Sequence, residues 1–305
     1  YTAIGQREDL SDVIYNISPT DTPFMSSVGK GKATATYHEW QKDSLASVNT
    51  SNAAVEGATA SDATMSPTVR AGNRTQISQK TVKISGTLES VDKAGRKSEK
   101  AYQLAKASAE IKRDMEAILL SNQAASAGNA STARTLGGLQ TWLATNGDFG
   151  TDGVAGASGT TTRTNGTDRT FTEAILKTVV AEVYTAGGSP KVLMVRPNHK
   201  QVVSTFAGIA AQRYMAPSDA PTTIVGAADV YLSDFGSISV VPNRFITDTD
   251  VAFIIDPDMA SVNYLRPFQT NELAKTGDAE VTQLLAEYTL QVSNEAGHGI
   301  IADLT

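Results

Sequence analysis

The stretch 96–127 contains neither glycine nor proline, and it constrains the fold more than any other part of the sequence. Its apolar residues recur at the spacing of one helix face. Two charged pairs stand at the i, i+4 spacing that supports a helix: Lys106 with Glu110, and Lys112 with Glu116. At about 1.5 Å per residue, such a helix is roughly 45 Å long. We therefore expect one long helix that acts as a scaffold.

Helical and strand-like segments alternate in the second half of the chain. Residues 170–184 repeat apolar side chains at helical spacing, and the run 191–196 is apolar enough for a buried strand. With a further helix over 197–206, this order predicts a domain of the α+β or α/β class. We also expect strands over 231–232, 237–242, 251–256 and 281–292, a hairpin tip over 247–250, and a surface loop over 148–168.

The first thirty or so residues are predicted to form an arm. Four apolar residues lie on one face of a short helix there, and proline follows it. The apolar stripe is narrow, so the helix must pack on another surface, either of its own chain or of a neighbour. These four residues are Leu10, Val13, Ile14 and Ile17.

A second projecting segment follows. Residues 34–40 alternate like a strand, 43–67 are almost all small or polar, and 74–86 alternate again. A tract so poor in large apolar side chains cannot bury itself. We expect a long two-stranded excursion that needs a neighbouring surface, with a disordered loop as the alternative. The candidate assembly residues of both segments are Leu10, Val13, Ile14, Ile17, Trp40, Ile77, Val82 and Ile84.

The sequence holds little equipment for catalysis. There is no cysteine, and the three histidines, His38, His199 and His298, are too far apart in sequence for a recognisable metal motif. No phosphate loop or nucleophile elbow occurs. We expect no catalytic, cofactor or metal site, although a hydrolase that uses His199 or His38 is an alternative. The residues considered for Ca²⁺ are Asp248, Asp250, Asp256 and Asp258, but their spacing misses the known loop pattern.

Charge and hydropathy narrow the choice of partners. A net charge of −6 argues against a protein that coats duplex DNA by neutralising phosphates. No apolar run is long enough to cross a membrane, and the first residues lack the pattern of a signal peptide. Two projecting segments that cannot fold alone, without catalytic groups, predict a structural subunit that lies on copies of itself.

Several blocks of the sequence, in order along the chain, resemble the major capsid proteins of tailed bacteriophages with the Hong Kong phage-type fold. No single block is specific, but the ordered set covers about half of the chain. The blocks are residues 8–24, 39–45 (Glu-Trp-Gln-Lys-Asp-Ser-Leu), 56–57, 73–78 (Asn-Arg-Thr-Gln-Ile-Ser), 82–87, 101–106, 114–120 and 136–139 (Leu-Gly-Gly-Leu).

The resemblance implies an α+β fold with five parts. They are an N-terminal arm over 1–35, an extended loop over 36–90, a peripheral domain with a spine helix over 91–134, an axial domain over 135–255, and a return to the peripheral domain over 256–305. No block matches a motif for the covalent crosslink that some capsids of this fold form.

The resemblance also implies a mechanical function. Hexamers and pentamers of the chain would tile an icosahedral virion shell around double-stranded DNA, which they would contact non-specifically, after assembly in the host cytoplasm. Portal, scaffolding or decoration proteins are the further partners implied, with no membrane and no cofactor. The alternative is another lattice-forming shell of a cell, such as an encapsulin, which would enclose cargo protein in place of DNA.

Overall fold

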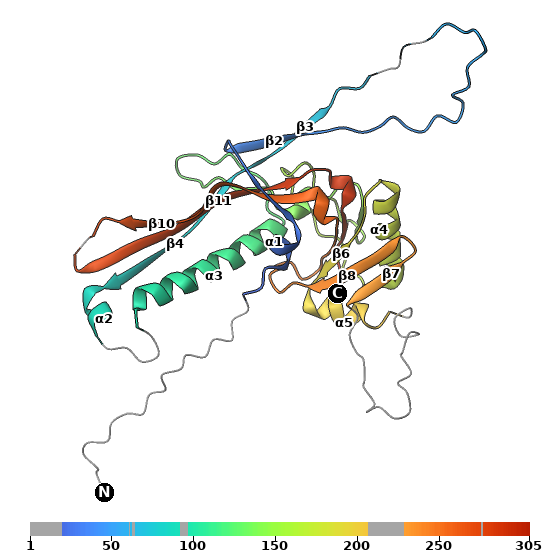
Figure 1. Ribbon diagram of the computed structural model, residues 1–305. Helices are drawn as coiled ribbons and strands as arrows, with labels where there is room; N and C mark the ends of the chain where they lie inside the picture. The colour runs from blue at the N-terminus through green and yellow to red at the C-terminus, as the bar shows by residue number, and fades with distance from the viewer. Residues whose placement is uncertain (1–19, 61, 63–64, 92–96, 207–228, 276) are drawn as a thin grey trace, which may run out of the picture.

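The structure is a computed structural model and describes residues 20–60, 62, 65–91, 97–206, 229–275 and 277–305. Within them the chain forms a four-stranded sheet, a six-stranded sheet and a two-stranded ribbon, together with helices (Figure 1). This mixture confirms the expected α+β class. The predicted arm helix falls on residues outside the described part of the chain.

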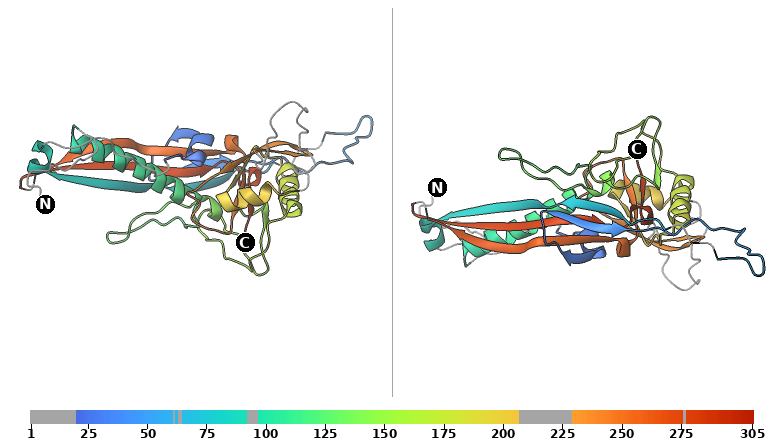
Figure 2. Two further views of the ribbon diagram at one scale, coloured as in Figure 1. Left: turned by 90° about the horizontal axis from the view of Figure 1, so that it is seen from below. Right: turned by 90° about the horizontal axis from the view of Figure 1, so that it is seen from above.

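The four-stranded sheet is long and carries one long helix. Its strands follow the order β1 (Gly29–Lys32), β10 (Ala260–Leu273), β11 (Ala279–Val292) and β4 (Gln76–Ser85). Helix α3 (Glu99–Leu120) crosses one face, since it lies in front of the strands in one view of Figure 2 and behind them in the other. The strand predicted over 281–292 is thereby confirmed as β11, in the interior of the sheet.

The long helix is confirmed, but it is shorter than expected. α3 has 22 residues, which corresponds to about 33 Å. It begins after Ser98, whose side chain caps the N–H of Ala101, and it ends at Leu120. The next residues leave the helix because other segments bind their backbone: Ala125 N–H donates to the carbonyl of Gly159. The lower limit of the prediction was three residues too early, and the upper limit was seven residues too far along.

The expected i, i+4 ion pairs on this helix are replaced by tertiary contacts. Glu110 binds Lys80 of β4 at 2.9 Å, and Asp114 also contacts Lys80 at 3.3 Å. Because of the hydrogen bond with Lys80, the pKa of Glu110 lies below its ordinary value. Glu116, expected to pair with Lys112, is instead buried among other donors, as described below.

The central strands of the six-stranded sheet are buried on both faces. In its strand β6, Leu193 and Val195 pack with helices α4 and α5, while Val192 and Met194 face the core beside α3. The helix and strand predicted over 170–184 and 191–196 are confirmed. In sheet order the strands are β5 (Gly147–Asp148), β12 (Gly299–Ile301), β9 (Ala252–Ile255), β6 (Val192–Val195), β8 (Gly236–Pro242) and β7 (Val230–Ser233), and the helices are α4 (Glu173–Thr185) and α5 (Pro197–Val203).

The pairing expected for the extended excursion is wrong in one respect. Strand β2 (Tyr37–Lys42) pairs with β3 (Val69–Arg74), and these two form the ribbon. The segment expected as the return strand forms β4, which pairs with β11 over its full length. An alternating apolar pattern predicts that a segment is a strand. Which strand it pairs with depends on packing against residues far away in the sequence.

Two loop predictions are also corrected. Residues 247–250 are not a hairpin tip, because β6 lies between β8 and β9 in the sheet. The segment 148–168 is more than a surface loop, since Arg163 within it is buried. The short helical elements are α1 (Pro23–Ser27), α2 (Gly86–Ser90), η1 (Leu139–Thr141), η2 (Pro257–Met259) and η3 (Glu295–Gly297).

Strand pairing assigns two segments across the expected domain limits. β4 lies within the range expected for the extended loop, yet it belongs to the four-stranded sheet. β12 lies within the range expected to return to the peripheral domain, yet it pairs with β9 in the six-stranded sheet. The division into domains stays a prediction. By hydrogen bonding, β4 belongs with the four-stranded sheet and β12 with the six-stranded sheet.

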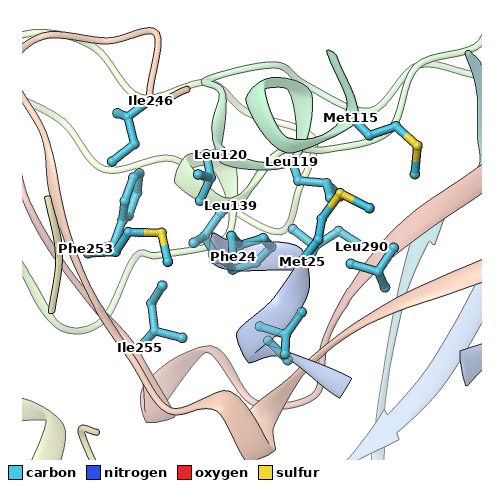
Figure 3. Packing of buried hydrophobic residues seen from close by; sticks show 14 of the residues in the cluster. Phe24, Met25, Met115, Leu119, Leu120, Leu139, Ile246, Phe253, Ile255 and Leu290 are labelled. Carbon is cyan, nitrogen blue, oxygen red and sulfur yellow. The ribbon is translucent and has the colours of Figure 1, made fainter. Parts of the chain in front are cut away.

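One hydrophobic core joins the two sheets, and the short helix α1 sits inside it. Phe24 and Met25 of α1 are buried there against Leu119 of α3, Phe253 of β9 and Leu290 of β11 (Figure 3). Burying a large apolar side chain contributes about 1.5–3 kcal/mol. Helix α1, which precedes β1, is therefore an internal plug at the junction of the sheets.

A buried carboxylate fixes this plug. Glu116 of α3 accepts hydrogen bonds from the backbone N–H groups of Phe24 at 2.6 Å and Met25 at 2.9 Å. It also accepts one from the side-chain amide of Asn243, which follows β8, at 2.7 Å. Burial raises the pKa of Glu116, although these three donors act to lower it. One side chain thus connects α1, α3 and the six-stranded sheet.

A second buried charge organises the segment between β5 and α4. Arg163 donates to Asp303 and to Asp250, both at 3.0 Å. Asp303, with a left-handed backbone at φ 58°, also accepts from the N–H groups of Gly150 and Gly166. The segment is therefore anchored to residues just before β9 and just after β12.

We expect Glu116→Gln to destabilise the fold by about 1–3 kcal/mol, because a glutamine NH₂ would face donors that now bind a carboxylate oxygen. Glu110→Gln on the same helix is the control, with an expected cost below about 1 kcal/mol, since Glu110 only pairs with Lys80 near the surface. Urea unfolding of both variants measures the difference. Equal losses would show that the three bonds to Glu116 are not specific.

We expect Asp303→Ala to cost about 3–5 kcal/mol, because it leaves the buried Arg163 with one partner fewer and two backbone N–H groups unpaired. Asp258→Ala is the matched control: Asp258 pairs with Lys191 at the surface, so its loss should cost less than about 1 kcal/mol. Thermal unfolding followed by circular dichroism compares them. A loss for Asp303→Ala no larger than for Asp258→Ala would contradict the role given to this cluster.

Candidate assembly surfaces

The loop between β2 and β3 extends away from the body of the chain (Figure 1). No part of the chain that the structure describes covers its large apolar side chains. Leu45 is 98% exposed, Val48 92% and Met65 93%. Exposed apolar residues that gather on one projecting segment mark an interaction site. We call residues 43–68 the ribbon loop.

The base of the ribbon, in contrast, is firmly held. The side chain of Asn73 donates to the carbonyl oxygens of Gly137 at 3.0 Å and Leu290 at 2.8 Å, and it accepts from the N–H of Gly137 at 2.8 Å. The ring of Trp40 lies 5.4 Å from that of Trp142 in the core. A fixed base and a free tip suit a segment that contacts another molecule.

The structure separates the predicted assembly residues of the ribbon and of β4. Trp40 is partly buried and packs on the core. Along β4 the side chains alternate, so Val82 and Ile84 face inward while Ile77 is 45% exposed. Val82 and Ile84 therefore stabilise their own sheet, and Ile77 is available for contact. The other four, Leu10, Val13, Ile14 and Ile17, lie outside the described residues.

A further apolar surface was not found by sequence reasoning. Tyr184 of α4 and Phe235 stack with ring centres 4.7 Å apart, and both are exposed. Val230 and Leu232 of the edge strand β7, which precede Phe235 in the sequence, are also exposed. Tyr231, between Val230 and Leu232, is buried. In the sequence Val230, Tyr231 and Leu232 are simply an apolar run, which does not reveal which side chains lie outside.

The histidines are not placed for hydrolysis. His199 is buried, and burial lowers its pKa, with Arg196 acting in the same direction. In His298, Nδ1 accepts from the N–H of Asp256 and Nε2 faces the carbonyl of Met259, so it is a packed structural residue. His38 lies among the amides of Asn263 and Gln291. These surroundings give the hydrolase alternative no support.

The aspartates considered for Ca²⁺ bind protein groups. Asp248 accepts from Gln140, Asp250 from Arg163, and Asp258 pairs with Lys191. Across the described residues, no three His, Asp or Glu side chains gather as a metal site. In that same part of the chain, no helix has the length and apolar content for a membrane span.

Comparison with known proteins gives the family. A model of the SU10 major capsid protein family matches residues 1–305. The major capsid protein of Escherichia phage Phieco32 is 31% identical over 342 residues, which cover 99% of this chain and 95% of that protein.

Solved structures agree on the fold. The capsid of cyanophage A-1(L) matches with a TM-score of 0.72 at 13% identity, over 98% of this chain and 97% of that chain. A chain of Mycobacterium phage Adephagia matches with a TM-score of 0.62 at 12% identity, over 98% and 95%. An encapsulin of Synechococcus elongatus matches with a TM-score of 0.58 at 9% identity, over 98% and 92%. The expected Hong Kong phage-type fold is confirmed, and the chain belongs to the SU10 major capsid protein family, which makes it a major capsid protein of a phage shell.

Proposed function

We propose that copies of this chain form hexamers and pentamers that tile an icosahedral shell around double-stranded DNA. The observation that carries this is the ribbon loop, whose apolar side chains are almost fully exposed on a firmly held base. In a closed lattice each subunit both gives and receives such a loop, so modest contacts add up. The predicted arm residues Leu10, Val13, Ile14 and Ile17 supply a second contact of the same kind.

The same proposal covers the shell's other partners. Contact with DNA is non-specific. It is also limited in extent, because a chain of net charge −6 does not bind phosphates over its whole surface. Portal, scaffolding and decoration proteins are the further partners proposed, and assembly takes place in the host cytoplasm. An encapsulin-like compartment is the alternative for the fold, but the full-length family match favours the phage shell over it.

Electron microscopy and light scattering of the purified protein at several concentrations test self-assembly. We expect rings or closed shells for the natural sequence. Leu45→Ser combined with Val48→Ser should raise the concentration needed for assembly at least about tenfold, because each buried apolar side chain contributes about 1.5–3 kcal/mol. Their high exposure predicts no change in the unfolding of the subunit.

Val154→Ser is the control for these substitutions. Val154 is also exposed, at 60%, but it lies on the segment between β5 and α4. We expect this variant to assemble at the same protein concentration as the natural sequence. Unchanged assembly of the double variant would show that the ribbon loop does not contact a neighbour.

A further inference from the structure

The solvent-facing side of α3 carries a group of positive charges. Lys106 and Arg113 stand seven residues apart, which places them on one side of the helix, about 10 Å from each other along its axis. Lys112, beside Arg113, is exposed as well. Arg244, also exposed, follows β8 and precedes Phe245, on which Arg113 packs. We call the four residues Lys106, Lys112, Arg113 and Arg244 the basic face of α3.

The acidic residues of α3 point elsewhere. Glu99 and Glu116 are buried. Glu110 and Asp114 both bind Lys80 of β4. Among the residues that the structure describes, no carboxylate lies within ion-pair distance of any cation of the basic face. The charge on this face is therefore left for another molecule.

Two aromatic rings hold part of the basic face in place. The guanidinium carbon of Arg113 lies 5.4 Å from the centre of the Phe245 ring, and Nζ of Lys112 lies 5.8 Å from the centre of the Phe268 ring. A ring face attracts a cation but has no net charge, so it does not neutralise the cation. Both side chains keep their full charge in a defined position, which reduces the entropy lost when an anion binds.

The basic face and the ribbon lie on opposite sides of the four-stranded sheet. Side chains alternate between the two faces along β10 and β11. Val262 and Leu290 point to the core that α3 covers. Their neighbours Asn263 and Gln291 point the other way and contact His38 of β2. Figure 2 shows α3 on one face of the sheet. Contacts made through the ribbon therefore leave the basic face of α3 free.

A nucleic acid duplex fits this face better than an acidic protein segment does. Duplex DNA carries one negative charge per about 1.7 Å of its axis, so several phosphates match the length between Lys106 and Arg113. An extended peptide can place at most one charge per about 3.3 Å. An amphipathic peptide would also need apolar surface, but the rings of Phe245 and Phe268 are already in contact with cations.

We propose that the basic face of α3 lines the inside of the shell and binds phosphates of the enclosed duplex DNA. This inference rests on the proposed function, because it names the surface that meets the DNA. Contacts from lysine and arginine to phosphates carry no sequence information, which agrees with non-specific binding. Their restriction to one face agrees with a net charge of −6 for the whole chain.

Fluorescence anisotropy of a short labelled DNA duplex tests the contact, with the protein kept below its assembly concentration. Lys106→Gln combined with Lys112→Gln removes two charges from the basic face. Lys83→Gln combined with Lys177→Gln is the control, because it changes the net charge equally. Lys83 lies on the face of β4 opposite to Lys80, which contacts α3, and Lys177 lies on α4. Circular dichroism checks that both variants are folded.

We expect the salt dependence of binding to change in the α3 variant alone. Between about 50 and 200 mM salt, the slope of log K against log salt concentration should become shallower by about 2, because each phosphate contact contributes about 0.9. Binding should weaken at least about tenfold, while the control keeps the natural slope to within about 0.5. Equal losses in the two variants would show that only net charge matters and would overturn the inference, as would a natural protein that does not bind the duplex.

Poly-glutamate as a second probe separates DNA from an acidic protein. We expect it to bind at least about tenfold more weakly than a duplex of equal charge, because its charges are further apart and it is disordered before binding. Equally tight binding would overturn the assignment to DNA. Electron microscopy of the same preparation at high concentration separates the two proposals. Shells together with a failed binding test overturn this inference alone, whereas a natural protein that forms neither rings nor shells overturns the proposed function and this inference with it.

Discussion

A buried carboxylate held by hydrogen bonds sets the arrangement of this subunit. Removing a charge from water is costly unless hydrogen bonds replace the lost solvent. Glu116 receives such bonds from two backbone N–H groups of α1 and from Asn243 after β8. All three donors are in place only when α1 occupies the core between the sheets. The charge therefore favours one relative position of α1, α3 and the six-stranded sheet, while the apolar side chains of Figure 3 supply most of the stability.

The surfaces offered to neighbours follow from this rigid centre. Because the core uses Phe24, Met25 and the inward side chains of both sheets, the segments left over are the ribbon loop, the β7 region and the edges of the four-stranded sheet. Each lies away from the junction. In this chain a buried core stands beside projecting segments whose apolar side chains are exposed.

Much of the fold was predictable from the sequence, and the failures have a common cause. The helices expected over 170–184 and 96–127 and the strands β6 and β11 were found because a repeating apolar pattern is local information. The partner of β4 and the crossover between β8 and β9 were missed, since strand pairing depends on residues far apart in sequence. Of the candidate site, the exposed ribbon loop was anticipated, whereas Asn73, Glu116 and the Tyr184–Phe235 pair were not. A polar side chain's role depends on donors and acceptors that the fold brings to it.

Three of the hydrogen bonds made by the Asn73 side chain have a mechanical consequence. They join the end of β3 to Gly137 and to Leu290 in β11, so the ribbon has no free hinge where it leaves the body. A pull on the loop is transmitted as tension along two paired strands and shared among bonds to separate elements. Pressure inside a shell would thus be transmitted through the paired strands β2 and β3 to the core of each subunit. Bending would be confined to the unpaired chain beyond Lys42 and Val69.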